Sequence, residues 1–134
     1  MKDFEKTELR ILVCGGRDFI GYNLLQNTLE DLFCDRNVDK VKIISGGATG
    51  ADFLAKVFAL DEYKENYWLT YQEFPANWKL YGKSAGAVRN QQMLEEGKPD
   101  LVVAFPGNKG TADMIARARK AGIEVMEVAP EQIT

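Results

Sequence analysis

Short apolar runs that end in glycine are the feature that most constrains how this chain folds. Three compact, largely β-branched runs, at residues 11–14, 41–44 and 101–105, are each followed within two residues by Gly or Pro-Gly. Runs of this kind are typical of strands buried on both faces at the centre of a parallel sheet. A fourth run, 123–128, alternates apolar and charged residues, as an edge strand does. A weaker strand candidate is 68–74.

Four segments between these runs carry apolar residues at helical spacing: 22–33, 51–60, 84–95 and 111–121. Strands that alternate with helices predict a parallel sheet, and right-handed crossovers place helices on both of its faces. We therefore expect an α/β fold with a doubly wound, mostly parallel five-stranded sheet. It forms a single domain over residues 9–134, behind an N-terminal tail at 1–8.

Composition excludes several kinds of chemistry. The 134-residue chain has a formal net charge of -3 and contains no histidine, so any acid–base step falls to carboxylates, Tyr, Lys or water. Its two cysteines, Cys14 and Cys34, lack the spacing of a zinc site. We expect Cys14 to be buried as a small apolar residue.

The N-terminal residues are charged, and no apolar run reaches the ~20 residues that a membrane span needs. We therefore expect a cytoplasmic protein without a membrane partner. The net charge makes nucleic acid an unfavoured partner.

Glycine-rich turns follow the carboxyl ends of the predicted strands, which share one edge of a parallel sheet. A phosphate group can approach the backbone N–H groups of a helix start where no Cβ blocks it, and hydroxyl groups can add hydrogen bonds. The candidate ligand-binding residues in these turns are Gly15, Gly16, Arg17, Gly46, Gly47, Thr49, Gly50, Trp78, Gly107, Gly110 and Thr111. The alternative is that the glycines only form tight turns. The turn at 45–52 lacks the Gly-Lys-Ser/Thr end of a P-loop and is not the GxGxxG fingerprint.

Charged and aromatic side chains near these turns suggest further roles. Arg17 and Arg89 are candidates to hold phosphate oxygens, although Arg89 would serve equally in a surface ion pair. Asp52 and Asp113 are the candidate catalytic carboxylates, and both would also suit the start of a helix. Trp78 is placed either to stack on a base or to pack in the core.

Taken together, these motifs resemble those of the SLOG superfamily. The residues concerned are 15–19, 46–52, 75–78, 85–90 and 105–111. They are most similar to the YspA/YpsA-related branch, and they also resemble the Lonely Guy phosphoribohydrolases and the DprA/Smf domain that processes DNA. The resemblance covers nearly the whole chain after Glu8. It implies a Rossmann-like fold that binds nucleotides or nucleotide-derived ligands.

The resemblance also implies an activity, with one departure. The catalytic arginine of the Lonely Guy enzymes matches Arg89, and their Pro-Gly-Gly-x-Gly-Thr-x-x-Glu motif aligns with residues 106–114. Asn108 replaces one glycine, and Met114 stands at the position of the catalytic glutamate. Asp113 is adjacent, but one residue along a helix is a rotation of ~100°, so we expect it to face away from the ligand.

Three functions follow as hypotheses. The first is binding of a nucleotide-derived phosphorylated ligand, with hydrolysis of its N-glycosidic bond. The second is a non-catalytic sensor or sequestering protein, and the third is a single-stranded DNA-binding module. No cofactor is required, although Asp18, Asp52 and Asp113 are candidates to hold Mg²⁺ through phosphates. The resemblance to proteins that pair through helices suggests a homo-oligomer.

Overall fold

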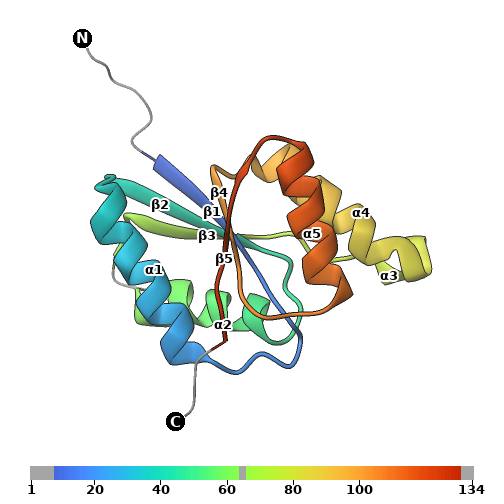
Figure 1. The fold of residues 1–134 in the computed structure, drawn as a ribbon, viewed down its shortest axis with the longest axis horizontal. Helices are drawn as coiled ribbons and strands as arrows, with labels where there is room; N and C mark the ends of the chain where they lie inside the picture. The colour runs from blue at the N-terminus through green and yellow to red at the C-terminus, as the bar shows by residue number, and fades with distance from the viewer. Residues whose placement is uncertain (1–7, 64–65, 131–134) are drawn as a thin grey trace.

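Five parallel strands form one sheet at the centre of the protein (Figure 1). The structure is a computed structural model that describes residues 8–63 and 66–130. The strands are β1 (Glu8–Cys14), β2 (Lys40–Ser45), β3 (Leu69–Glu73), β4 (Leu101–Ala104) and β5 (Glu124–Glu127), in the order β3-β2-β1-β4-β5. All four strand pairs are parallel, which confirms the predicted α/β fold.

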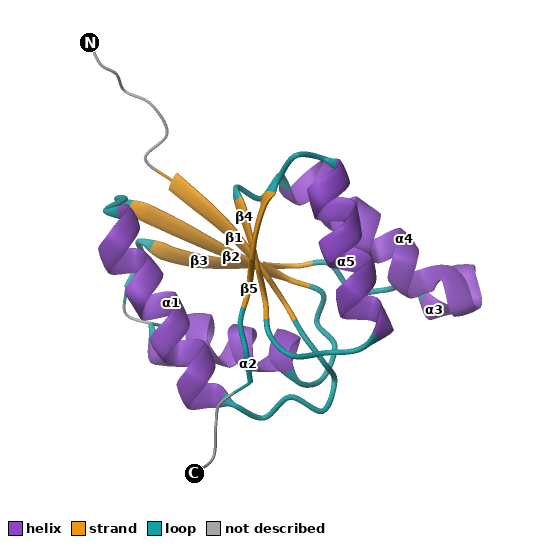
Figure 2. Cartoon of the chain, in the orientation of Figure 1, coloured by secondary structure: helices purple, strands orange, loops and turns teal. Residues whose placement is uncertain are grey.

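Helices cover both faces of this sheet (Figure 2). The α-helices are α1 (Tyr22–Arg36), α2 (Ala51–Val57), α3 (Trp78–Tyr81), α4 (Ala85–Gln92) and α5 (Lys109–Lys120). Two π-helical turns, η1 (Phe58–Glu62) and η3 (Met93–Gly97), extend α2 and α4, and a 3₁₀ turn, η2 (Gly82–Ser84), joins α3 to α4.

The core divides into one cluster on each face of the sheet. Leu25 and Leu29 of α1 and Ala55 of α2 pack on one face, together with the alternate β1 residues Ile11 and Val13. On the other face, η3 and α5 pack against side chains that include Leu12 of the same strand. Because side chains along a strand alternate between faces, β1 contributes to both clusters. The helices on the two faces therefore make the sheet doubly wound.

The predicted positions of the strands within the sheet are confirmed. β2, β1 and β4 are the central strands, and β4 is buried throughout. β5 lies at one edge and β3 at the other, with partly exposed side chains. Gly122, in the left-handed region, ends α5, and the Ile123 amide donates back to the Ala118 carbonyl.

The structure adds three details that the helical spacing did not give. The segment that contains Trp78 is the short helix α3, not a loop; Asn77 begins it by accepting a hydrogen bond from the Leu80 amide at 3.0 Å. Ser84 precedes α4 but makes no capping bond. Phe53 belongs to the apolar pattern of α2 but is 54% exposed. Glu8 begins β1, and the rest of the expected tail, 1–7, lies outside the described residues.

The order of the strands creates a switch point between β1 and β4. The chain leaves β1 for α1 on one face of the sheet and leaves β4 for α5 on the other. The two loops separate at the carboxyl ends of these neighbouring strands, and a crevice opens there in folds of this type.

Candidate functional site

A cleft of about 1150 Å³ lies at this switch point. Small-molecule sites typically enclose ~300–1,000 Å³, so this cleft has room for a ligand of nucleotide size. It is bordered by the loops after β1 and β4, the starts of α2 and α5, and one side of α4. The lining residues that carry polar or charged side chains are Arg17, Asp18, Asp52, Lys83, Arg89, Asn90, Asn108, Lys109, Thr111 and Asp113.

Close packing of backbone explains several of the glycines. A Cβ at Gly15 would lie 2.6 Å from the Cβ of Ala51. Gly50 has φ +78°, and a Cβ there would overlap the carbonyl oxygen of Gly16. The Gly16 amide donates to the Pro106 carbonyl at 2.8 Å, and the Gly16 carbonyl accepts from the Ala51 amide at 3.2 Å. The loop after β1 is thus held between the loops after β2 and β4.

The first turn of α5 faces the cleft with few obstructions. A Cβ at Gly107 would overlap the Thr111 side chain, so Gly107 is needed to close the turn. Gly110, in contrast, has open space around it, and it lines the cleft with Lys109 and Thr111. The amides of this first turn have no preceding helical carbonyl to accept them. This helix start therefore offers N–H groups to an anion.

Asp52 occupies the corresponding place at the start of α2. Its side chain is 7% exposed, and one carboxylate oxygen accepts the Ala48 amide at 3.2 Å. Burial raises the pKa of Asp52 to about 6, against the opposing effects of the Ala48 hydrogen bond and the charge of Arg89. The turn is therefore stabilised by its own carboxylate.

Arg89 crosses from α4 to this turn. Its Nη1 donates to the Gly46 carbonyl at 2.7 Å, and its Nε donates to Asn90 Oδ1 at 3.3 Å. Burial lowers the pKa of Arg89, Asp52 opposes that shift, and the nearby positive charge of Arg17 lowers the pKa further. Arg89 is thus held by protein groups inside the cleft, and among the described residues it forms no surface ion pair.

Arg17 lies over the ring of Trp78, 5.6 Å from the ring centre. This geometry allows a cation–π interaction between the guanidinium group and the indole. Trp78 is 50% exposed, so the alternative of a core tryptophan is wrong. Trp78 lines the cleft at its exposed side, and the guanidinium of Arg17 lies over part of the indole ring.

Asp113 has the opposite orientation from the one expected from the sequence, whereas Met114 is buried, in keeping with the apolar pattern of its helix. Asp113 lines the cleft, so the expectation that it faces away was wrong. Met114 is 1% exposed and packs in the apolar cluster against the sheet. Asp113 accepts hydrogen bonds from Asn90 at 3.0 Å and from Arg117 Nε at 2.8 Å. Burial tends to raise the pKa of Asp113, but these bonds and the Arg117 charge outweigh it and lower the pKa.

A smaller groove of about 330 Å³ adjoins the cleft. Gly46, Gly47 and Thr49 line this groove and not the main cleft, whereas Arg17, Trp78 and Arg89 line both. The sequence-predicted residues are therefore divided between two connected hollows. Gly50 and Gly107 line neither the cleft nor the groove, and they serve the packing of the loops.

The three aspartates named as candidates for Mg²⁺ do not form a metal centre by themselves. Within residues 8–63 and 66–130, no three side chains of His, Cys, Asp or Glu are grouped so that they could hold a metal ion. Asp52 and Asp113 are engaged with an amide and with Arg117, as described above. Asp18 is exposed on the loop after β1.

Sequence reasoning missed several residues of the cleft. Asn90 appeared only within a motif, yet it is 7% exposed and bonds to both α4 and α5 residues. Lys109 borders the cleft but appeared only within the 106–114 motif, whereas the sequence did indicate Lys83, as part of the positively charged stretch around Arg89 that suits an anionic ligand. Cys14 is buried as expected, but it also lines the cleft; burial raises its pKa to about 12, so the thiol stays protonated at neutral pH.

Comparison with known proteins identifies the family to which this fold and cleft belong. The described part of the chain holds no helix with the length and apolar character to cross a bilayer. The chain is 33% identical over 119 residues to the Gene 61 protein of Mycobacterium phage D29, which covers 87% of this chain and 94% of that protein. Residues 9–81, from β1 through α3, match the model of the YspA, cpYpsA-related SLOG family. The chain therefore belongs to this SLOG family.

Proposed function

We propose that the cleft binds a nucleotide or a nucleotide-derived phosphorylated ligand. The observation that carries this proposal is the convergence of cations and free helix-start amides on one cleft at the switch point. Arg17, Lys83, Arg89 and Lys109 all border it. Within the described residues, none of the four is in an ion pair with a carboxylate. Membership of the SLOG family supports the same class of ligand.

Two anion positions fit the proposal best. One is the first turn of α5, where Lys109 adds a charge to the amides of Gly110 and Thr111. The other lies between Arg17 and Arg89, where the cleft and the groove join. A base would meet the apolar surface of Trp78 at the exposed side of the cleft. A ligand with one or more phosphates and a planar ring would use all three.

Binding is tested by calorimetry against nucleoside monophosphates, ADP-ribose, NAD and cyclic nucleotides. We expect at least one to bind, and Arg89→Ala to weaken its affinity by roughly 10- to 100-fold, as for a lost charge-assisted hydrogen bond. Arg36→Ala is the matched control, because Arg36 pairs with Glu124 on the surface, apart from the cleft. Binding equal in Arg89→Ala and wild type would contradict this site. Repeating the titration with EDTA shows whether Mg²⁺ contributes.

Hydrolysis of the N-glycosidic bond is the finer proposal, and Asp52 supports it. A buried carboxylate with a pKa near 6 beside a cleft suits a group that stabilises an oxocarbenium-like state or orients water. Asp113 suits this less well, because Arg117 and Asn90 already engage its carboxylate. Chromatography of bases released from nucleoside monophosphates is the assay. We expect Asp52→Asn to abolish release while it leaves binding measurable.

A non-catalytic sensor is the alternative, and the burial of Met114 favours it. The position that holds the catalytic glutamate in Lonely Guy enzymes is closed to the cleft in this chain, because Met114 packs in the core. Tight binding without any base release would support the sensor. Base release that Asp52→Asn removes would exclude it. Oligonucleotide binding that weakens steeply with salt would instead revive the DNA-binding alternative.

A further inference from the structure

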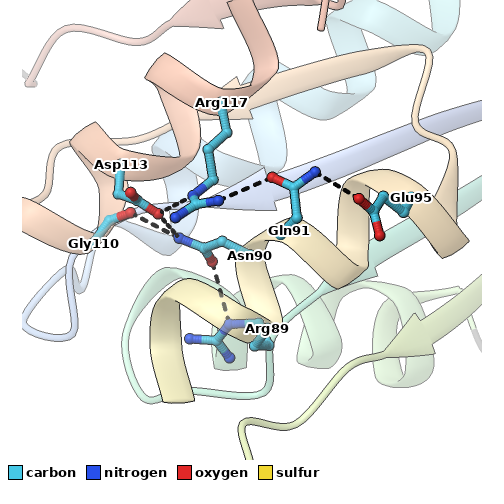
Figure 3. Close-up of polar contacts among 7 residues, drawn as sticks. All are labelled: Arg89, Asn90, Gln91, Glu95, Gly110, Asp113 and Arg117. Atoms are coloured by element: carbon cyan, nitrogen blue, oxygen red, sulfur yellow. Dashed lines mark hydrogen bonds and ion pairs between the residues drawn. The ribbon is translucent and has the colours of Figure 1, made fainter. Parts of the chain in front are cut away.

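Asn90 joins the two halves of the cleft through a fully used amide group (Figure 3). Its Oδ1 accepts from Arg89 Nε at 3.3 Å. Its Nδ2 donates to the Gly110 carbonyl at 3.2 Å and to Asp113 Oδ2 at 3.0 Å. Asn90 therefore contacts the arginine that reaches the α2 turn and also the first turn of α5.

The chemistry of these neighbours requires an asparagine. The Arg89 side requires an acceptor, whereas the carbonyl and carboxylate of α5 require donors. An aspartate would place a carboxylate against two acceptors, and an aliphatic residue would leave buried polar groups unsatisfied. Asn90 is 7% exposed, so water does not readily replace these bonds. Only one orientation of the amide satisfies all three partners.

An outer set of polar contacts fixes Asp113 in turn. Arg117 donates through Nε to Asp113 and through Nη1 to Gln91 Oε1 at 2.9 Å. Gln91 also donates to Glu95 at 2.9 Å. Figure 3 shows these contacts running between α4 and α5, away from Arg89. The carboxylate that Asn90 contacts is thus also held by Arg117, which does not line the cleft.

From this geometry we infer that Asn90 is a positioning residue for ligand binding. It sets the guanidinium of Arg89 and the first turn of α5 at a fixed separation, so that one ligand meets both anion positions. This inference rests on the proposed function for its ligand, but the positioning itself can be measured without one. The role depends on Asn90 acting through Arg89 and Gly110, not on contact with the reacting atoms.

The ligand-free test is nuclear magnetic resonance of the ¹⁵N-labelled protein. In Asn90→Ala we expect hydrogen exchange at Arg89 Nε–H to accelerate by about tenfold or more, and the amide resonances of the first turn of α5 to shift because the Gly110 carbonyl loses its Asn90 donor. Gln91→Ala is the matched control, because it breaks only the outer contacts with Arg117 and Glu95 and keeps every bond of Asn90. Its exchange at Arg89 is expected to match that of wild type.

A second variant separates the contact of Asn90 with Arg89 from its contacts with α5, and it provides a test if Asn90→Ala does not fold. Asn90→Asp keeps an acceptor for Arg89 Nε but removes both donors toward α5. We expect protection of Arg89 Nε–H to persist while the amide resonances of the first turn of α5 shift as they do in Asn90→Ala. A purely structural role predicts changes of similar size throughout α4 and α5 instead. A lowered melting temperature in Asn90→Ala, with unchanged exchange at Arg89 Nε–H and unshifted amide resonances in the first turn of α5, would overturn the inference.

The ligand-bound test uses inorganic phosphate and adenosine 5′-monophosphate as probes. We expect Asn90→Ala to weaken adenosine 5′-monophosphate binding by about tenfold, and by clearly less when Arg89→Ala is already present. Equal effects in both backgrounds would refute action through Arg89. If wild type binds neither these probes nor the wider panel, while exchange changes as expected, the proposed function fails and the positioning role stands.

Discussion

Asp52 combines a stabilising contact with a costly burial. Its carboxylate holds the Ala48 amide, yet desolvation raises its pKa to about 6 from an ordinary value of 3.8. A group with a perturbed pKa in a cleft is a candidate for function, because packing alone would select a neutral side chain there. Arg89 nearby offsets only part of the desolvation.

The first prediction concerns the pH dependence of stability. Between about pH 4 and pH 6 the folded protein keeps a proton on Asp52 that the unfolded chain releases, so the free energy of unfolding falls as pH rises. The fall amounts to roughly 3 kcal/mol at most. Asp52→Asn cannot titrate at this position and lacks this fall. The free energy of unfolding of the variant minus that of wild type should therefore increase as the pH rises from about 4 to 6.

Urea unfolding of both proteins from about pH 4 to pH 7 measures this difference. Asp18→Asn controls for the loss of a charge near the cleft. Parallel curves for Asp52→Asn and wild type would show that the Asp52 carboxyl group is not desolvated as described.

At the level of elements, the three loops at the switch point depend on one another. The loop after β1 donates to the loop after β4 and accepts from the start of α2. Gly15, Gly16 and Gly50 allow this contact because they carry no Cβ. The glycines of the 45–52 turn therefore have two different roles. Gly50 allows the backbones of two loops to pack, and Gly46 leaves room for the guanidinium of Arg89.

The second prediction separates these roles. Gly50→Ala places a Cβ against the Gly16 carbonyl at φ +78° and should cost on the order of 3 kcal/mol of stability. Gly46→Ala meets side-chain atoms only, the guanidinium of Arg89 and the carboxylate of Asp52, and should cost less than Gly50→Ala, about 1 to 2 kcal/mol, because Arg89 loses its hydrogen bonds when it moves aside. It should still weaken ligand binding by about tenfold, because Arg89 is displaced.

Unfolding experiments and calorimetry on both variants test this pair. Loss of stability in Gly46→Ala as large as in Gly50→Ala would mean that Arg89 cannot move aside. Unchanged ligand affinity in Gly46→Ala would mean that the position of Arg89 does not matter for binding.

At the scale of the whole molecule, the ligand would bridge helices from opposite faces of the sheet. The cleft is lined by the start of α2 on one face and by α4 and α5 on the other. A ligand that binds only the folded state stabilises the whole domain by mass action. The expected homo-oligomer stays a prediction, and exposed apolar residues of α3 and α4, such as Leu80 and Val88, are where substitutions would test it.

The third prediction is therefore a thermal shift. At a ligand concentration 100 times its dissociation constant, stability should increase by about 2.7 kcal/mol, which raises the melting temperature by on the order of 10 °C. Differential scanning fluorimetry of wild type and Arg89→Ala at equal ligand concentration measures it. A ligand that binds by calorimetry but produces the same shift in both proteins binds elsewhere.

Local pattern alone determined the strands, most of the helices, the parallel sheet and the loops that border the cleft. Periodicity and glycine position report the burial and backbone freedom of each segment, and these depend on neighbours in sequence. The tertiary structure decided which residues meet. It placed Asp113 in the cleft and Met114 in the core, joined Asn90 to Arg89 and Gly110, and gave Gly50 a packing role. These outcomes depend on contacts between segments distant in sequence, which no local pattern records.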